Sequence, residues 1–212
     1  MKISILSVGP PYRGGIAEQT YQLYLNLKNS HDIDLINFSR QYPKLLFPGK
    51  TQYEIDSKAD IEKNYRIIDS INPLSWISTA RFIIKIAPNL IILRFWNPFF
   101  SLSYGYILKK IKKQIPHTKI IAICDNIIPH EESITDKILI KYLFNKIDGF
   151  IVMSSKVEKE LVSLRTNTKY KKLFHPVSFK KQPVSKAIAK ERLKINSDKV
   201  ILFFGFVRNY KG

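Results

Sequence analysis

The 212-residue sequence predicts an α/β fold with a Rossmann-like, doubly wound parallel sheet. Short apolar runs alternate with segments of helical period, which is typical of this class. The runs are continuous, as in LIILR at 90–94 and KIIAIC at 119–124, and strands covered on both faces of a parallel sheet have such compositions. Hydrophobic residues make up 45% and charged residues 25% of the chain, which excludes disordered and fibrous proteins.

The first elements follow in order from these patterns. Residues 2–8 (KISILSV) are a continuous apolar run and predict a buried strand, and residues 16–27 have apolar side chains at helical spacing. The run DIDLINF at 32–38 predicts the second strand. Residues 41–60 combine Pro, Gly, Lys and Tyr with little periodicity and predict a long loop.

The later elements repeat the alternation. Apolar runs predict strands at 90–94, 119–124, 150–153 and, shorter, 171–174. Helical periodicity predicts helices at 73–86, 100–115, 133–147 and 155–164. Ser154 or Ser155 is expected to cap the last of these helices. Strand and helix in regular succession predict a parallel sheet wound in two directions.

The chain changes in character after residue 176. Residues 1–176 are predicted to form one Rossmann-like domain, and residues 177–198 a polar linker with a short helix. Residues 199–212 begin with the apolar KVILFFGFV and are interpreted as the first strand of an incomplete second domain. The alternative is that this strand docks on the edge of the first sheet, because a lone strand leaves both faces and edges uncovered.

The charge of the chain is strongly basic. Lys and Arg total 35 against 17 for Asp and Glu, which gives a formal net charge of +18. Such an excess favours polyanionic partners: nucleic acid, anionic lipid or phosphorylated substrates. The alternative is a chain rich in Ile, Lys and Asn throughout, as biased base composition would produce.

Cysteine content and hydropathy limit the compartment and the kind of site. Cys124 is the only cysteine, which excludes a disulfide framework and a cysteine-rich metal site. No uncharged apolar run reaches the roughly 18 residues of a membrane-spanning helix. We therefore expect a cytoplasmic protein, soluble or peripheral on the inner face of the cytoplasmic membrane.

The loop after the first strand has the composition of an anion-binding turn. Gly14 and Gly15 let the backbone approach a ligand, the following helix start offers N–H groups, and Arg13 adds a guanidinium. The loop is not G-x-G-x-x-G, and the second strand ends in Ser39-Arg40 rather than an acid, which disfavours a nicotinamide dehydrogenase. It is also not a P-loop. The alternative is a tight strand–helix turn.

Two further loops follow predicted strands, where ligands bind in parallel α/β sheets. Trp96 and Asn97 could stack on and bond to a sugar or base, or could be core and capping residues. The segment after Cys124 crowds polar groups that could position hydroxyls or move a proton: Asp125, Asn126, His130 and Glu131. Helix capping and solvated acids are the alternative there, and the spacing matches no standard metal site.

Three segments in order resemble glycosyltransferases of the GT-B fold, in the retaining family-4 group: PPYRGGIAEQT, CDNIIPHE and ILFFGFVRNYKG. The resemblance implies an acceptor-side Rossmann-like domain, a second domain that binds a nucleoside diphosphate sugar, and catalysis between them. It implies transfer to a saccharide or lipid-linked acceptor with retention, as in hexosyltransferases of polysaccharide biosynthesis. It implies no catalytic metal and no cofactor besides the donor substrate.

The resemblance also assigns roles to residues. Gly14 and Gly15 match the glycine loop that faces donor phosphates and acceptor, and Asp125-Asn126 stands where many members have His-Asn or His-Asp. Asp125 therefore replaces the usual active-site histidine, while His130 and Glu131 fit a subgroup pattern.

The closing segment matches the start of the donor side. Lys211 corresponds to the lysine that neutralises the donor diphosphate, and Phe206 stands where the family has arginine. Arg208 is the candidate replacement for that arginine. The remainder of the donor domain would lie beyond Gly212, so the 212-residue chain alone is expected to be inactive. The alternative is a non-catalytic acceptor- or lipid-binding module, or a remnant of a glycosyltransferase.

Two expectations concern large partners. The segment Ile107–Lys119 combines five lysines with apolar Ile107, Leu108 and Ile111, which resembles a basic amphipathic helix on anionic lipid. A solvated helix face is the alternative. Nucleic acid is excluded as a partner, because the lysines are dispersed and no nucleic-acid motif occurs.

Overall fold

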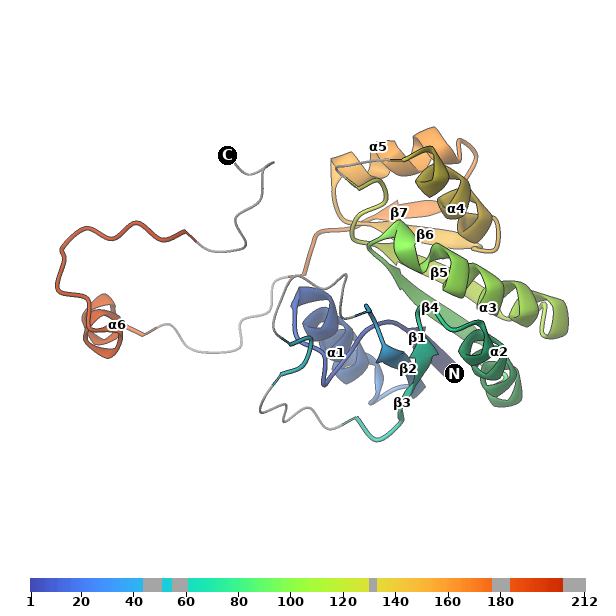
Figure 1. Ribbon diagram of the computed structural model, residues 1–212, viewed down its shortest axis with the longest axis horizontal. Coiled ribbons are helices and arrows are strands. Elements are labelled where there is room, and N and C mark those ends of the chain that lie inside the picture. The colour runs from blue at the N-terminus through green and yellow to red at the C-terminus, as the bar shows by residue number, and fades with distance from the viewer. Residues whose placement is uncertain (44–50, 55–60, 130–132, 177–183, 204–212) are drawn as a thin grey trace. The chain divides into compact units, whose positions relative to one another are not determined.

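The computed structural model describes residues 1–43, 51–54, 61–129, 133–176 and 184–203 (Figure 1). The chain divides into two compact units, Met1–Pro176 and Val177–Gly212. In the second unit, helix α6 (Lys186–Leu193) begins at Ser185, whose hydroxyl accepts a hydrogen bond from Ile188 N. Residues 199–203 of the predicted strand 199–207 are not in a strand, and the rest of that segment lies outside the described residues.

The first unit contains a seven-stranded, entirely parallel sheet in the order β3-β2-β1-β4-β5-β6-β7. The strands are β1 (Lys2–Leu6), β2 (Asp32–Arg40), β3 (Asn64–Asp69), β4 (Leu90–Phe95), β5 (Lys119–Cys124), β6 (Gly149–Val152) and β7 (Tyr170–Lys172). The predicted α/β, Rossmann-like class is confirmed. The winding direction reverses between β1 and β4, and ligands bind at such switch points.

One strand was not predicted. β3 lies at the sheet edge beside β2, and only Ile68 of its six residues is buried. Its sequence NYRIID lacks the continuous apolar run of the central strands because an edge strand is not covered on all sides. The predicted loop at 41–60 therefore precedes a strand that periodicity alone misses.

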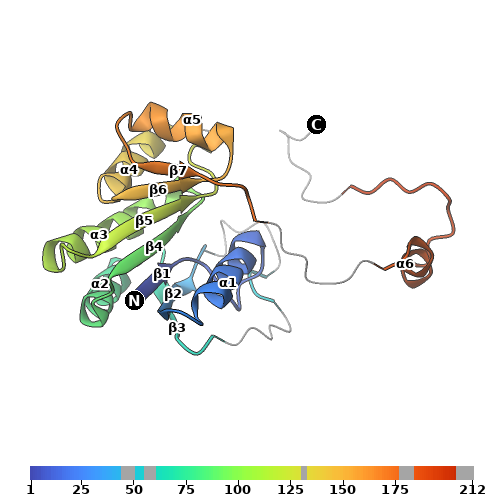
Figure 2. The same ribbon diagram turned by 180° about the vertical axis from the view of Figure 1, so that it is seen from behind.

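Helices cover the two faces of the sheet unequally. Helix α1 (Gly15–Leu27) covers the face of β1 and β2 that carries Ile3, Ile5, Ile33 and Leu35. The opposite face is buried under helices α2 (Pro73–Ile86), α3 (Ser101–Gln114), α4 (Ile134–Phe144) and α5 (Ser155–Leu164). Figure 2 shows α2, α3 and α4 in succession along that face, and contacts join α2 to α3 and α3 to α4.

The helices begin at residues that the sequence marks clearly. At α2, Asn72 accepts a hydrogen bond from Leu74 N and is followed by Pro73. At α4, Ser133 and Asp136 form a capping box. At α5, Ser154 is the capping residue. Ser154, rather than Ser155, is therefore the cap. Among the described residues, no helix is long and apolar enough to cross a membrane.

The predicted lipid-facing helix requires a correction. In α3, Ile107, Leu108 and Ile111 are fully buried in the core of the first unit. Lys112 also bonds within the domain, to Asp148 at 2.7 Å and to the carbonyl of Thr118. These apolar side chains cannot enter a bilayer while the domain is folded, so the geometry of α3 fits the alternative of a solvated lysine face.

Candidate functional site

The loop after β1 turns sharply into α1 at the carboxyl edge of the sheet. Gly14 has φ +115° and ψ 166°, a region open essentially to glycine alone, although nothing lies within 4 Å of the position that a Cβ would take. Backbone conformation rather than space therefore requires glycine there. Gly14 is also the N-cap of α1 and supplies no capping side chain, and the first N–H groups of a helix lack intrahelical partners. The turn thus has the geometry of an anion-binding helix start.

Two asparagines hold the start of this loop. The buried Asn37 on β2 accepts from Gly9 N at 3.1 Å and donates to the carbonyls of Gly9 and Pro10. Asn64 on β3 donates to the carbonyl of Pro10 at 2.8 Å. Gly9 lies so close to β2 that a Cβ would approach the Leu35 side chain to 2.8 Å. Sequence reasoning missed Asn37, although a polar residue inside the run DIDLINF was its signal.

The far side of the loop is fixed by residues 51–54. Arg13 N donates to the carbonyl of Gln52, and Tyr12 forms an antiparallel bridge with Tyr53. The Arg66 guanidinium lies 5.5 and 5.3 Å from the centroids of the Tyr12 and Tyr53 rings. Burial raises the pKa of Tyr12 far above its ordinary value, and the neighbouring Tyr53 acts in the same direction. The backbone of the loop is therefore held while the Arg13 side chain stays exposed.

A buried ion pair occupies the ends of β4 and β5. Arg94 Nε donates to Asp125 Oδ2 at 2.8 Å, and Arg94 Nη2 donates to Asp125 Oδ1 at 2.5 Å. Their side chains are 5% and 11% exposed. Backbone pairing sets this geometry, because β4 and β5 run in register to Phe95 and Cys124 and Asp125 N donates to the carbonyl of Phe95. A two-point bond of this kind fixes the orientation of the carboxylate.

The pair continues into a chain of hydrogen bonds. Arg94 Nη2 also donates to Gln19 Oε1 on α1, so the Gln19 amide nitrogen is directed away from the arginine. That nitrogen lies 2.9 Å from His175 Nε2 and can only donate to the imidazole ring. His175 Nδ1 lies 3.2 Å from the carbonyl of Pro176 and 3.3 Å from the same Gln19 nitrogen. The Arg94–Asp125 pair is therefore linked through Gln19 to His175.

The predicted site residues fall into three groups. Gly14, Gly15 and Asp125 lie at the carboxyl edge of β1 and β5, with Asn126 half-buried beside Asp125. Trp96 and Asn97 follow β4 at the same edge. His130, Glu131, Arg208 and Lys211 lie outside the described residues. Their predicted roles in catalysis or binding stay predictions.

Trp96 and Asn97 have structural partners. The Asn97 side chain accepts from Phe99 N at 2.9 Å and caps the short helix η2 (Pro98–Phe100). Trp96 packs on Phe100 with ring centroids 4.7 Å apart and donates from Nε1 to Tyr42 Oη. These contacts fit the alternative of core and capping residues.

Sequence reasoning missed Arg94, Gln19 and His175. Arg94 closes the apolar run LIILR, and a charge at the end of a buried strand was its local signal. Gln19 and His175 are 156 positions apart, and nothing in their local sequence indicates contact. Cys124 is fully buried, which raises the pKa of its thiol far above the ordinary value and disfavours a thiolate nucleophile.

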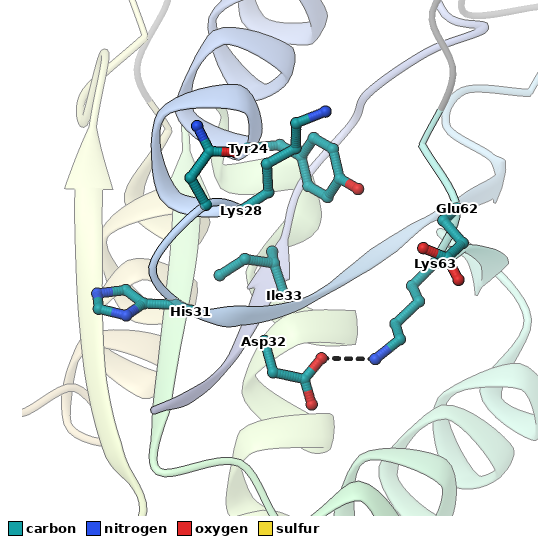
Figure 3. Close-up of a pocket in the computed structure, with 8 residues that line it drawn as sticks. Tyr24, Lys28, His31, Asp32, Ile33, Glu62 and Lys63 are labelled. Carbon is teal, nitrogen blue, oxygen red and sulfur yellow. Dashed lines mark hydrogen bonds and ion pairs between the residues drawn. The ribbon is translucent and has the colours of Figure 1, made fainter.

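Two cavities show how the edges of the sheet differ. At the carboxyl edge, a groove of about 580 Å³ lies among the N-terminal ends of α2, α3 and α4, with Trp76, Phe99, Leu102 and Pro129 in its lining. At the amino edge, a pocket of about 320 Å³ includes Lys28, Glu62 and the ion pair Asp32–Lys63 (Figure 3). Across the part of the chain that is described, no cluster of His, Cys, Asp and Glu is arranged to hold a metal ion.

No protein-family model matches the sequence, and no curated protein matches it. Solved structures with similar folds include an α-glucosyltransferase in complex with UDP-glucose and DNA containing an abasic site, with TM-score 0.49 and 13% identity over 89% of this chain and 44% of that chain. Another is an α-glucosyltransferase in complex with UDP and a 13-mer DNA containing a central A:G mismatch, with TM-score 0.48, 12% identity and coverage of 80% and 40%. A sucrose-phosphate synthase structure from Thermosynechococcus elongatus has TM-score 0.48 and 15% identity over 92% of this chain and 97% of that chain.

The chain thus spans less than half of the length of the α-glucosyltransferases that it resembles. One expectation is corrected by them. Nucleic acid was excluded because the lysines are dispersed and no motif occurs, yet two of these similar structures are glucosyltransferases in complex with DNA. Dispersed lysines and a missing motif are therefore insufficient grounds for that exclusion.

Proposed function

We propose that the protein takes part in glycosyl transfer from a nucleoside diphosphate sugar, with the site at the carboxyl edge of β1, β4 and β5. The observation that carries the proposal is the buried, two-point Arg94–Asp125 pair beside the Gly14 turn. A carboxylate withdrawn from water and fixed by two bonds suits the positioning of a sugar hydroxyl. An open helix start suits the developing negative charge of a leaving diphosphate.

The proposed roles follow from these positions. Asp125 binds and orients sugar or acceptor hydroxyls, and Asn126 adds an amide beside it. Arg13 and the N–H groups at the start of α1 supply positive potential for phosphate oxygens. Arg94 acts through Asp125 as a positioning residue, because its donors are directed to Asp125 and Gln19. Electrostatic stabilisation of this kind is worth about 3 kcal/mol for each donor in measured enzymes.

The finer features rest on the resemblance of the three sequence segments. They are retention of anomeric configuration, hexosyl transfer, and a saccharide or lipid-linked acceptor in polysaccharide assembly. The reaction also uses no cofactor besides the donor substrate. Roles for His130, Glu131, Arg208 and Lys211 belong to the same proposal, as does a location in the cytoplasm.

The test is a transfer assay on the protein in the length in which the cell makes it. A panel of nucleoside diphosphate sugars is offered with saccharide and lipid-linked acceptors, and released nucleoside diphosphate and glycosylated product are both measured. We expect product with one donor class and, by NMR of the new linkage, the anomeric configuration of the donor. Inversion would remove the retaining assignment, and binding of acceptor without turnover across the panel would favour a non-catalytic module.

A further inference from the structure

The chain ends its course through the first unit at the carboxyl edge of the sheet. After β7, the backbone runs back toward α1 (Figure 2), and Leu173 N donates to the carbonyl of Val152. Apolar packing does not hold this segment, because Leu173 is 46% and Phe174 is 98% exposed. His175 nevertheless contacts α1, with its Nε2 at 2.9 Å from the amide nitrogen of Gln19. A polar side-chain contact, rather than burial, therefore holds the chain at His175.

Gln19 contacts two partners through the two ends of one amide. Its Oε1 accepts from Arg94 Nη2, and its Nε2 donates to the ring of His175. The last torsion of a glutamine side chain has a broad preference, so a single contact leaves the amide able to rotate. Contacts at both ends fix it, and the ends cannot be exchanged, because arginine only donates and must face the oxygen. His175 therefore fixes the position of the oxygen that Arg94 uses.

The Arg94 guanidinium has Gln19 as its third anchor. Its Nε and Nη2 donate to the two oxygens of Asp125, and Nη2 also donates to Gln19. Three bonds from one planar group define its plane as well as its direction. The Asp125 carboxylate takes its orientation from that plane, since both of its oxygens bond to the same guanidinium. A displacement of the Gln19 amide would therefore be transmitted to the carboxylate.

We infer that His175 is a positioning residue for Asp125, acting through the two side chains that lie between them. The inference rests on the proposed function, in which Asp125 orients sugar or acceptor hydroxyls. It adds that the orientation of Asp125 depends on the course of the chain at the end of the first unit, where His175 and Pro176 are the last residues. His175 contacts Gln19 rather than the reacting groups, so it acts on the geometry of the site and not on the substrate.

NMR of the whole 212-residue chain measures the state of the guanidinium directly. The Arg94 Nε–H group donates to Asp125 within a buried pair, so we expect its proton to exchange slowly with water. His175→Ala should accelerate this exchange at least about fivefold, because the Gln19 amide loses its second contact. His175→Gln offers a carbonyl acceptor to the same amide and should keep the exchange rate near that of wild type. The measurement does not depend on glycosyl transfer.

A double-mutant cycle tests whether the effect passes through Gln19. Gln19→Met keeps an unbranched side chain of similar length and removes the amide. It should accelerate the exchange by itself, and His175→Ala added to it should have no further effect. His117→Ala is the matched control, because His117 is also exposed but lies in the turn before β5 at the amino edge. This control should leave the exchange unchanged, and circular dichroism verifies that all variants are folded.

Transfer kinetics extend the test to the reaction, with the protein in the length in which the cell makes it. His175→Ala should lower kcat about tenfold, because a small displacement of a positioning group slows the chemical step. The KM values for donor and acceptor should stay nearly unchanged, since His175 does not contact the substrate. His175→Gln should restore kcat, and His117→Ala should leave both constants as in wild type.

Three outcomes would overturn the inference. The first is an unchanged exchange rate of the Arg94 Nε–H proton in His175→Ala. The second is additivity of Gln19→Met and His175→Ala, which would mean that the two side chains act independently. The third is faster exchange with an unchanged kcat, which would reduce the contact to a structural one. Absence of transfer by the unmodified protein would instead contradict the proposed function, and the exchange rates would still decide whether His175 orients Asp125.

Discussion

An ion pair between a basic residue and an aspartate lies at each edge of the sheet, and the two pairs differ in burial. At the carboxyl edge, Arg94 and Asp125 have side chains 5% and 11% exposed and share two hydrogen bonds. At the amino edge, Lys63 and Asp32 are 38% and 48% exposed and share one (Figure 3). Burying charges costs desolvation free energy that pairing barely offsets. A positioning role explains the carboxyl-edge pair better than a gain in stability does, which supports the proposal of a site at that edge.

The largest expected effect comes from breaking the buried pair. Arg94→Met leaves Asp125 buried without its cation, and the free energy of unfolding should fall by about 3–5 kcal/mol. Lys63→Met is the matched change at the amino edge and should leave the denaturation midpoint nearly unchanged, because its partner is solvated. Urea denaturation of both variants measures the contrast. Equal losses would remove the distinction between the edges.

The turn at α1 gives a smaller effect. Gly14→Ala forces a side chain onto a φ of +115° and should cost about 1–3 kcal/mol. Gly15→Ala is the control, since Gly15 has no positive φ and open space around its Cβ position, and it should be neutral or slightly stabilising. Thermal unfolding of the two variants separates conformational strain from crowding. If Gly14→Ala left the unfolding temperature unchanged, the turn would not be held in this conformation.

A third prediction concerns a buried acid on β2. Asp34 is 3% exposed, its Oδ2 lacks a hydrogen-bond partner, and burial raises its pKa above the ordinary value. The folded state thus holds the proton of Asp34 more tightly than the unfolded state does. The stability that this proton contributes is fully present below the unfolded-state pKa of about 3.9. It is lost as the pH rises through the folded-state pKa. Asp34→Asn should remove this loss and raise stability at neutral pH by about 1 kcal/mol.

The measurement is chemical denaturation of wild type and Asp34→Asn at several pH values. The difference between the two curves should grow with pH and level off above the folded-state pKa. Asp32→Asn serves as the control on the same strand, where the hydrogen bond from Lys63 lowers the pKa of the carboxyl. Relative to wild type, Asp32→Asn should become less stable as the pH rises, because wild type gains the Asp32–Lys63 ion pair when Asp32 ionises and the variant does not. Parallel pH profiles for Asp34→Asn and wild type would contradict the account.

Local patterns predicted the parts of the fold that local chemistry determines. Continuous apolar runs indicated the central strands, and Ser, Asn and Pro marked helix starts. β3 was missed because an edge strand needs no continuous apolar run. In the site, Asp125 and Gly14 were predicted from their place after strands, whereas the Gln19–His175 contact depends on the finished fold. The hydrogen bonds of Asn37 and Asn64 to the carbonyl of Pro10 likewise form only when β1, β2 and β3 lie side by side.

Glycosyl transfer by paired aspartate variants tests the central claim most directly. Asp125→Asn alters the carboxyl edge and Asp32→Asn makes the same chemical change at the amino edge, while Asn126→Ala leaves the Arg94–Asp125 pair intact beside the site. The assay uses folded protein, verified by circular dichroism, with the donor and acceptor found in the panel. We predict that Asp125→Asn lowers kcat/KM about 100-fold or more, that Asn126→Ala lowers it less, and that Asp32→Asn leaves it unchanged. Full activity in both Asp125→Asn and Asn126→Ala would contradict the assignment of function to the carboxyl edge.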